Sequence, residues 1–338
     1  MKVALLIRDP VEQSGSRLRA VQWIPHLEAA GASVRVLPWV VHSRQDLVRY
    51  AMHAARLARW ADVVVFHKPC QPRWLINAVR RLTPRMLVDF DDAVWAPLPG
   101  EALAPWHDRL RVRLVRSMRA ADGVLVGSHR LGEWVAASAP AVPVTWMPTC
   151  VDLADYPDVK RAVDGPAAVG WIGAGANLGD LETLGPALRR LSGDSGDSKA
   201  TLTVISDRPA TLPGVCSRFV PWSRAGEAAA LLTLDIGVMP LRDSDRARGR
   251  CGFKAIQYMA TGLPVVASPV PGPSEVVEDG VTGLFAVDNG AWEQQLRKLT
   301  HDTSLRSELG ASGREAAESR YSVQANLPRL LAVLRGSD

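Results

Sequence analysis

Two short segments of this 338-residue chain concentrate residue types that could do chemistry. One is basic and rich in glycine: RGRCGFK contains Gly249, Arg250, Gly252 and Lys254, and a predicted helix begins around Phe253. Glycine lets the backbone approach a ligand closely, and the amino end of a helix attracts anions, as arginine and lysine do. The segment therefore predicts a diphosphate-binding site. A basic surface turn before a core helix is the plainer alternative.

The other segment is acidic. Asp89, Asp91 and Asp92 lie within DFDDAVW, directly after the apolar run MLV. Three carboxylates within four residues repel one another unless a cation, a hydroxyl-rich ligand or an arginine balances them. A ligand site at this point is one interpretation. An aspartate that caps the next helix, among solvated neighbours, is the other.

Polar residues also follow other apolar runs. Gly15 lies in a loop that leads to Arg17 and Arg19 at a helix start, where backbone N–H groups and an arginine could hold an anion. An ordinary capped helix with solvated arginines is an equal alternative. His129 follows GVLV, and Lys68 follows ADVVVFH, so either could reach a ligand at the end of a strand. A structural or solvated side chain is the alternative for both.

The elements that position these residues alternate along the chain. Short apolar runs of strand length, such as KVALLI and ADVVVF, alternate with helical patterns, which predicts parallel sheets joined by right-handed crossovers. A polar stretch beginning at Pro148 separates two such series. We expect domains at 1–150 and 151–320, and a final helix at 321–338 that packs back toward the N-terminal domain. Ligands of such folds bind at the carboxyl ends of the strands.

Composition narrows the class of protein. Hydrophobic residues at 47% and charged residues at 22% exclude intrinsic disorder as the main state. No run approaches about 18 apolar residues, and MKVALLIRDP becomes charged too early for a secretory signal, so we expect a soluble cytoplasmic protein. The four cysteines lie far apart, which predicts reduced thiols and neither a disulfide framework nor a zinc site.

The net charge of +5 suits anionic ligands. No basic block alternates with aromatic residues, so we expect no nucleic-acid partner. The stretch Trp95 to Asp108 is expected to be irregular. No basic amphipathic helix stands out in the N-terminal half, and peripheral contact with an anionic membrane surface stays open on the charge balance alone. The oligomeric state stays open too.

A family resemblance rests on particular motifs. The segment from Asp235 to Phe285, with DIGVMPL, CGFKAIQYMATGLPVVAS and EVVEDGVTGLF, resembles the donor-binding half of the family 4 glycosyltransferases of the GT-B fold. VGWIGAG and MPTCVDLADYP extend the resemblance backwards, and LVDFDDAVW is similar to one subgroup with a DFDDAxW motif.

The resemblance implies two Rossmann-like domains facing a central cleft, the N-terminal one for the acceptor and the C-terminal one for the donor. It implies a nucleotide-diphosphate sugar as co-substrate, first of all a UDP-sugar, and transfer of a hexose to an acceptor hydroxyl with retention of anomeric configuration. It further implies that neither a metal nor another cofactor is required.

Residue patterns and resemblance together assign the site. The expected catalytic residues are Asp91, Lys254 and Arg250. The expected donor-binding residues are Gly173, Ala174, Gly252, Phe253, Gln257 and Glu275. The expected acceptor-binding residues are Arg17, Asp92 and His129.

The chain departs from the family pattern at two points. The two glutamates of the Glu-x7-Glu motif would fall on Gly249 and Gln257, so both are absent. Gln257 can still bond a ribose hydroxyl as donor or acceptor. Asp91 stands where the family often has a histidine, and could bind an acceptor hydroxyl or stabilise positive charge at the anomeric carbon.

Other functions stay open. A nucleotide-sugar 2-epimerase shares the two-domain architecture and would form product without an acceptor. A non-catalytic sugar-nucleotide binder would explain the loss of both glutamates. Asp89-Phe90-Asp91 also matches the DxD pattern that holds a metal-bound nucleotide in another glycosyltransferase fold, but that fold has a single sheet and would not produce two alternating halves.

Overall fold

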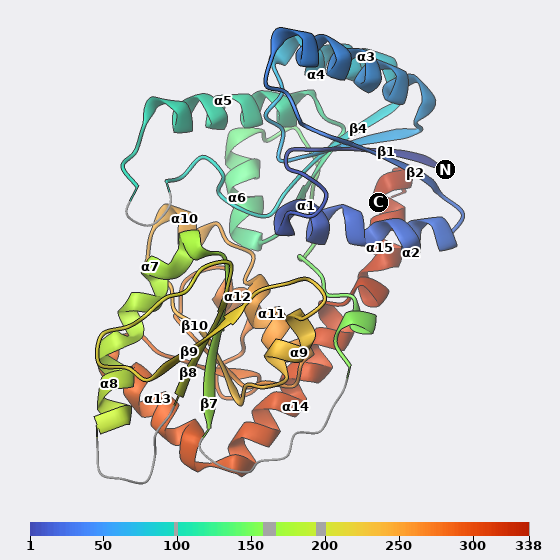
Figure 1. Ribbon diagram of the computed structural model, residues 1–338. Coiled ribbons are helices and arrows are strands. Elements are labelled where there is room, and N and C mark those ends of the chain that lie inside the picture. The colour runs from blue at the N-terminus through green and yellow to red at the C-terminus, as the bar shows by residue number, and fades with distance from the viewer. Residues whose placement is uncertain (98–100, 158–166, 194–200, 338) are drawn as a thin grey trace. The chain divides into compact units, whose positions relative to one another are not determined.

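The chain folds into two units, each built on its own sheet. The computed structural model describes residues 1–97, 101–157, 167–193 and 201–337. Unit 1 comprises Met1–Pro97, Ala102–Cys150 and Ala325–Asp338, and Val151–Gln324 forms the main part of unit 2. Each unit contains a parallel six-stranded sheet with helices packed on it (Figure 1). The polar, low-complexity stretch SGDSGDSKA at 192–200 is predicted from its composition to be a loop, and most of it lies outside the described residues.

The sheet of unit 1 has the strand order β2-β1-β3-β4-β5-β6. Its strands are β1 (Lys2–Ile7), β2 (Ser33–Pro38), β3 (Val63–His67), β4 (Arg85–Phe90), β5 (Gly123–Val126) and β6 (Val144–Trp146). The inner strands are buried along almost their whole length because helices cover both faces, which explains why they are continuous apolar runs in the sequence.

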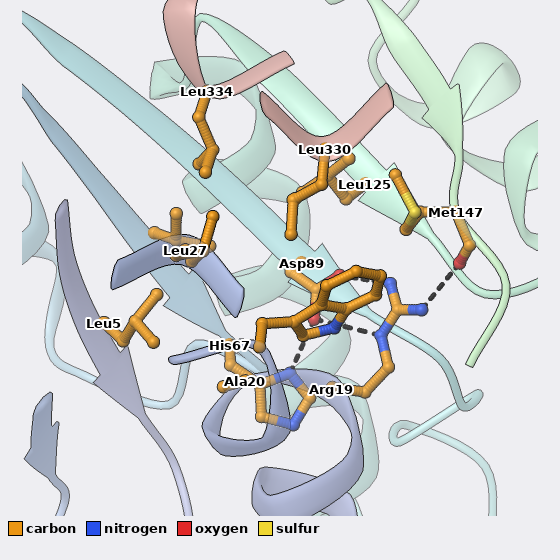
Figure 2. Close-up of a pocket in the computed structure, with 12 residues that line it drawn as sticks. Leu5, Arg19, Ala20, Leu27, His67, Asp89, Leu125, Met147, Leu330 and Leu334 are labelled. Atoms are coloured by element: carbon orange, nitrogen blue, oxygen red, sulfur yellow. Dashed lines mark hydrogen bonds and ion pairs between the residues drawn. The ribbon is translucent and has the colours of Figure 1, made fainter. Parts of the chain in front are cut away.

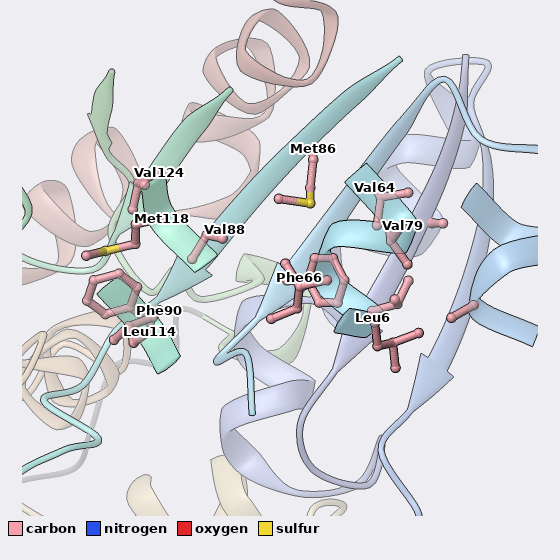
Figure 3. Close-up of a cluster of buried hydrophobic side chains, with 14 of the residues drawn as sticks. Leu6, Val64, Phe66, Val79, Met86, Val88, Phe90, Leu114, Met118 and Val124 are labelled. Carbon is pink, nitrogen blue, oxygen red and sulfur yellow. The ribbon is translucent and has the colours of Figure 1, made fainter. Parts of the chain in front are cut away.

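Along each strand of this sheet, successive side chains pack alternately against the helices on one face and the helices on the other. Leu6, Phe66 and Val88 point into a core with α3 (Arg44–Trp60), α4 (Arg73–Leu82), α5 (Pro105–Ala120) and α6 (His129–Ser138), as Figure 3 shows in part. Leu5 and Leu125 point to the other face, toward α2 (Ile24–Ala29) and α15 (Val323–Arg335) (Figure 2). This alternation is the period of two expected of a strand.

Two expectations for unit 1 are wrong. The apolar pattern of RLRAVQWIPHLEAAG predicts one helix that ends at Gly31, but the structure divides this stretch into α1 (Ser14–Arg19), a 3-10 turn at Val21–Trp23, and α2. Pro25 sits in the first turn of α2, where its missing N–H is tolerated, and it would break a continuous helix.

A basic amphipathic helix does occur in this half of the chain. Helix α5 begins at Pro105, inside the stretch expected to be irregular, and buries Leu110, Leu114 and Met118 at helical spacing. Its other side exposes five arginines. The high arginine content masks the apolar stripe in the sequence, because only three large apolar residues mark the buried side.

The sheet of unit 2 has the strand order β12-β11-β10-β7-β8-β9. Its strands are β7 (Ala168–Ile172), β8 (Thr201–Ser206), β9 (Ser217–Pro221), β10 (Ile236–Met239), β11 (Val265–Ala267) and β12 (Gly283–Phe285). A core around the fully buried Trp171 and Val238 extends to Trp292 on the helix that follows β12.

The described helices of unit 2 connect these strands. They are α7 (Leu178–Leu181), α8 (Gly185–Gly193), α9 (Glu227–Leu231), α10 (Asp245–Arg248), α11 (Phe253–Ala260), α12 (Pro273–Val276), α13 (Asn289–His301) and α14 (Thr303–Arg320). Helix α11 packs closely on β10, since a Cβ at Gly237 would lie 2.3 Å from the Tyr258 ring. Among the described helices of the chain, none has the length and hydropathy to cross a bilayer.

Candidate functional sites in the two units

In unit 1 the first carboxylate of DFDD is buried and neutralised. Asp89 accepts hydrogen bonds from the Arg19 guanidinium, one of them at 3.3 Å, and its Oδ2 lies 2.7 Å from Nδ1 of His67 (Figure 2). Arg19 also donates to the Met147 carbonyl at 2.6 Å. Burial raises the pKa of Asp89, but the Arg19 charge and the His67 hydrogen bond outweigh it and hold that pKa below its ordinary value.

The other two carboxylates surround Lys68. Its Nζ lies 2.6 Å from Oδ1 of Asp91 and 3.5 Å from Oδ2 of Asp92. Thr149 donates to Oδ2 of Asp91 at 3.1 Å. Lys68 has a φ of +49°, in a region that a non-glycine residue rarely adopts, directly after β3. Arg19 and Lys68 of the chain itself thus compensate part of the charge of the three carboxylates, with two cations against three anions.

Asp91 is ionised in this arrangement. Burial raises its pKa, but the charge of Lys68, followed by those of Arg19 and His67, shifts it well below the ordinary range. Such a carboxylate is a weak base at neutral pH. It can accept a hydrogen bond from a hydroxyl or stabilise a nearby positive charge.

The first turn of α1 borders the same cluster. A Cβ at Gly15, expected in a loop but found in this helix, would lie 3.3 Å from Nζ of Lys68, so the start of α1 lies against the lysine. Arg17 is buried on α1. His129 is exposed at the start of α6, and its ring stacks on Trp146 with centroids 4.7 Å apart. The structure thus brings Gly15, Asp91 and Asp92 together around Lys68, and places His129 against Trp146.

In unit 2 the central group is Lys254, on the first turn of α11. The Lys254 side chain is half-buried, and Nζ lies 4.1 Å from the centroid of the Trp171 ring. A Cβ at Gly173 would lie 2.6 Å from that Nζ and 2.8 Å from the ring, so only glycine at 173 leaves room for the pair. Gly173 directly follows β7, as predicted, and its N–H donates to the Ile205 carbonyl at 3.0 Å.

Positive charge exceeds negative charge around Lys254. Arg250 donates to Asp180 at 3.1 Å and to Asn177 at 2.7 Å. Burial, and to a lesser extent the charge of Arg250, lower the pKa of Lys254 to about 7, although the charge of Asp180 acts in the opposite direction. One carboxylate therefore serves two cations. An anion placed here would be stabilised by both, and would restore the charge of the lysine.

Two glycines let the loop before α11 cross the loop before α12. Gly252 has a φ of +70° and a Cβ there would lie 2.8 Å from the Gly272 carbonyl oxygen. A Cβ at Gly272 would in turn collide with the Arg250 carbonyl. Glu275 lies on α12, which packs against α11. Phe253 is half-buried at the start of α11, and Ala174 is exposed after β7.

Gln257 lies in a separate hydrogen-bond network within unit 2. Its amide donates to Tyr156 at 3.0 Å, and Tyr156 donates to Glu227 at 2.8 Å. Trp222 completes the network with a 2.7 Å bond to the same glutamate. This network uses the amide nitrogen of Gln257, so a ribose hydroxyl would bond to its amide oxygen. The contact between Gln257 and a ribose stays a prediction.

Sequence reasoning missed the partners of the two cations. From the sequence, packing is the more common role for Trp171 and a sugar-stacking platform the less common one, and neither Asp180 nor Asn177 has an assigned role. The available signal was their place: Trp171 precedes Gly173 by two residues, and the other two lie in GAGANLGD, directly after the same strand. Side chains on that edge can reach α11 because β10 and β7 are neighbours.

Comparison with known proteins supports the family resemblance for unit 2. Residues 168–302 match the family model for Glycosyl transferases group 1. The GDP-mannose-dependent alpha-(1-6)-phosphatidylinositol monomannoside mannosyltransferase of Mycobacterium tuberculosis H37Rv is 30% identical over 248 residues, covering 70% of this chain and 56% of that protein. The chain thus spans about half the length of this relative. The capsular polysaccharide biosynthesis glycosyltransferase CapM of Staphylococcus aureus is 34% identical over 76 residues, covering 22% of this chain and 20% of that protein.

Solved structures confirm the predicted GT-B fold, with its two Rossmann-like sheets. Sucrose-phosphate synthase from Thermosynechococcus elongatus superposes with a TM-score of 0.72 at 15% identity, over 100% of both chains. Anabaena HepE, solved in complex with UDP and glucose, gives a TM-score of 0.72 at 14% identity, over 99% of this chain and 100% of that one. The DFDDAxW subgroup stays a prediction.

Proposed function

We propose that this chain, whose residues 168–302 match the group 1 glycosyltransferases, transfers a hexose from a nucleoside diphosphate sugar to an acceptor hydroxyl. We further propose that anomeric configuration is retained and that no metal takes part. The observation that carries the proposal is the position of Lys254. Its ammonium group lies over the Trp171 ring, in space that a side chain at residue 173 would fill, and positive charge exceeds negative charge around it. A diphosphate is the ligand that this arrangement suits.

Lys254 and Arg250 act on the leaving group. As the bond from the anomeric carbon to the diphosphate oxygen breaks, negative charge grows on the diphosphate, and these two cations stabilise it more in the transition state than in the ground state. Arg250 has five N–H donors, of which Asp180 and Asn177 each engage one. The amino end of α11 at Phe253 adds to the field.

The acceptor reaction needs no separate base. The acceptor oxygen bonds to the anomeric carbon on the face that the diphosphate leaves, and the acceptor proton passes to the departing phosphate oxygen. Asp91 is a weak base because Lys68 holds it ionised, so its role is to bind the acceptor hydroxyl or to stabilise the positively charged sugar. Asp92, Arg17 and His129 are the further acceptor residues of the proposal.

The remaining donor contacts follow the sequence assignment: Gly173, Ala174, Gly252, Phe253, Gln257 and Glu275. A UDP-sugar is the first candidate donor, and UDP is the nucleotide named with the HepE structure. A GDP-sugar is the second, because the M. tuberculosis relative is named as GDP-mannose-dependent. The relatives named here are transferases, which does not favour a 2-epimerase or a non-catalytic binder.

Calorimetric titration with UDP, GDP, dTDP and ADP, with and without Mn²⁺, tests the donor site. We expect one diphosphate to bind without Mn²⁺, and Lys254→Met to abolish that binding. The control is Lys298→Met, which removes the same charge from the exposed side of α13. Absence of binding by all four, or binding that requires Mn²⁺ and is lost in Asp91→Asn, would overturn the donor site as proposed.

Proton uptake gives a second reading of the same titration. If a diphosphate raises the lowered pKa of Lys254, binding at pH 8 takes up a proton, and the apparent enthalpy changes with the ionisation enthalpy of the buffer. The control variant retains this uptake. Product analysis by NMR then establishes the anomeric configuration, and incubation without acceptor detects any epimerase reaction.

A further inference from the structure

The outer surface of unit 1 carries a large excess of arginine on one side of the sheet. Helices α3, α4 and α5 expose eleven arginines, and the acidic side chains on these three helices are two: Asp46, which is partly exposed, and Asp108, which is exposed. Five of the arginines lie on α5: Arg109, Arg111, Arg113, Arg116 and Arg119.

These three helices form one continuous layer. Helix α4 packs against both α3 and α5, and all three bury their apolar sides in the same core (Figures 1 and 3). Their outward sides therefore belong to a single surface, which we call the basic face and define as the exposed residues of α3, α4 and α5, together with Leu103 just before α5.

Few acidic side chains of unit 1 balance this charge. Arg111 pairs with Asp108 at a distance of 3.6 Å, between two exposed side chains. Arg113 and Arg119 donate to the carbonyls of Cys70 and Ser138, which leaves their charge uncompensated. An exposed ion pair such as Arg111–Asp108 contributes little, so the basic face is free to attract external anions.

Large apolar side chains are interspersed with the arginines. Leu103, Trp74, Trp106 and Val112 are exposed by 69%, 53%, 46% and 41%. Trp74 and Trp106 lie in the first turns of α4 and α5. Those turns follow the carboxyl ends of β3 and β4, the edge of the sheet at which Lys68 and Asp91 lie.

We propose that the basic face binds the surface of an anionic lipid bilayer, with its arginines on lipid phosphates and Trp74, Trp106 and Leu103 in the interfacial region. Basic helices with exposed Trp and Leu bind such interfaces by combining electrostatic attraction with burial of apolar area. A nucleic acid would satisfy the arginines but would leave Leu103 and Val112 in water. The proposal does not depend on the donor site.

Flotation of the 338-residue chain with vesicles tests the proposal. The vesicles are phosphatidylcholine alone or with 30% phosphatidylglycerol, at low and high salt. The variant Arg81→Gln/Arg109→Gln/Arg116→Gln removes three charges from the basic face. Its control, Arg218→Gln/Arg224→Gln/Lys298→Gln, removes three charges from exposed sites of unit 2.

We expect binding to phosphatidylglycerol vesicles only, weakened on the order of a hundredfold by the first triple variant and much less by the control. Trp74→Ser/Trp106→Ser should weaken the binding that persists at high salt. Equal loss in both triple variants, no binding to anionic vesicles, or tighter binding to a DNA duplex that is insensitive to the tryptophan changes would each overturn the proposal. Circular dichroism of every variant checks that the fold is intact.

Discussion

The two units share a parallel six-stranded architecture, but the ratio of carboxylates to cations near the carboxyl ends of their strands is opposite. In unit 1, the three carboxylates of Asp89, Asp91 and Asp92 face the two cations Arg19 and Lys68. In unit 2, Arg250 and Lys254 both lie near the carboxylate of Asp180. Among these groups, carboxylates outnumber cations in the first site and cations outnumber carboxylates in the second.

The difference separates two kinds of ligand. A cluster with more carboxylates than cations repels an anion but can accept a hydrogen bond from a neutral hydroxyl. A site with excess positive charge near a half-buried lysine gains most from an anion. This difference agrees with the proposed function, in which unit 1 binds the acceptor and unit 2 the diphosphate, and the variants described next test that division.

Breaking the buried Arg19–Asp89 ion pair of unit 1 should have the largest effect on stability. Asp89→Ala leaves the guanidinium of Arg19 buried without its carboxylate, and we expect a loss of about 3–5 kcal/mol in the free energy of unfolding, measured by urea denaturation. Arg19→Met/Asp89→Leu removes both charges and should recover much of that loss. A double variant as unstable as Asp89→Ala would show that the unpaired charge of Arg19 is not what destabilises Asp89→Ala.

Removing the excess charge in unit 2 should act on activity instead. We expect Lys254→Met to lower kcat about 10²–10³-fold, as loss of one preorganised oxyanion donor does, without lowering the free energy of unfolding. Lys298→Met is the control for both measurements. A destabilised Lys254→Met with unchanged kcat would mean that the lysine is structural.

A methyl group at residue 173 should disturb the same site by a steric clash, without any change of charge. The added Cβ of Gly173→Ala would lie 2.6 Å from Nζ of Lys254, and we expect a destabilisation of about 1–3 kcal/mol together with weaker nucleotide binding. Gly132→Ala in α6 is the matched control, since its nearest neighbours are at 3.7 Å. Equal stability of the two variants would contradict the tight packing described here.

The pH dependence of stability distinguishes the units further. The pKa of Lys254 is about 7 in the folded chain and that of a free lysine is 10.5, so above pH 7 the unfolded state binds more protons and stability rises with pH toward 10.5. We expect the wild type to gain about 1 kcal/mol over Lys254→Met between pH 7.5 and 8.5. Parallel profiles for the two proteins would contradict the lowered pKa.

The carboxylates of unit 1 affect the pH dependence of stability at acidic pH. Because the pKa of Asp89 is lowered in the folded chain, its contribution to stability is complete above the unfolded pKa of about 4 and is lost as pH falls through the folded value.

The smallest effect is expected at the exposed ring of His129. His129→Ala should change the free energy of unfolding by less than about 0.5 kcal/mol. If His129 contacts the acceptor, as proposed, the KM for the acceptor rises severalfold while nucleotide affinity is unchanged. An unchanged KM would remove this residue from the acceptor site.

The sequence predicted the sheets better than their helices. Apolar runs such as KVALLI and TLTVIS mark strands because burial on both faces leaves no room for polar residues. The helix after β1 was predicted as one piece, since an apolar pattern does not register that Pro25 divides it. Helix α5 was missed because arginines dominate its composition.

The candidate residues were found by motif, but their partners were not. Lys254 and Gly173 stand in recognisable segments, whereas their contact spans 81 residues of sequence and depends on the pairing of β7 with β10. Arg19 was noted only as a residue of a helix start, and its bond to Asp89, 70 residues away, becomes visible only when β1 and β4 lie in one sheet.

Helix α15 determines the order in which the two units can be completed during translation. Leu330 and Leu334 of that helix cover Leu5 and Leu27 of unit 1, although all of Val151–Gln324 lies between them in sequence (Figure 2). Unit 2 is contiguous over that range, so a ribosome releases its strands before it releases the last helix of unit 1. Until α15 is released, the part of the N-terminal sheet that Leu330 and Leu334 cover stays exposed beside α2, and such transiently exposed apolar surface is what chaperones bind during synthesis.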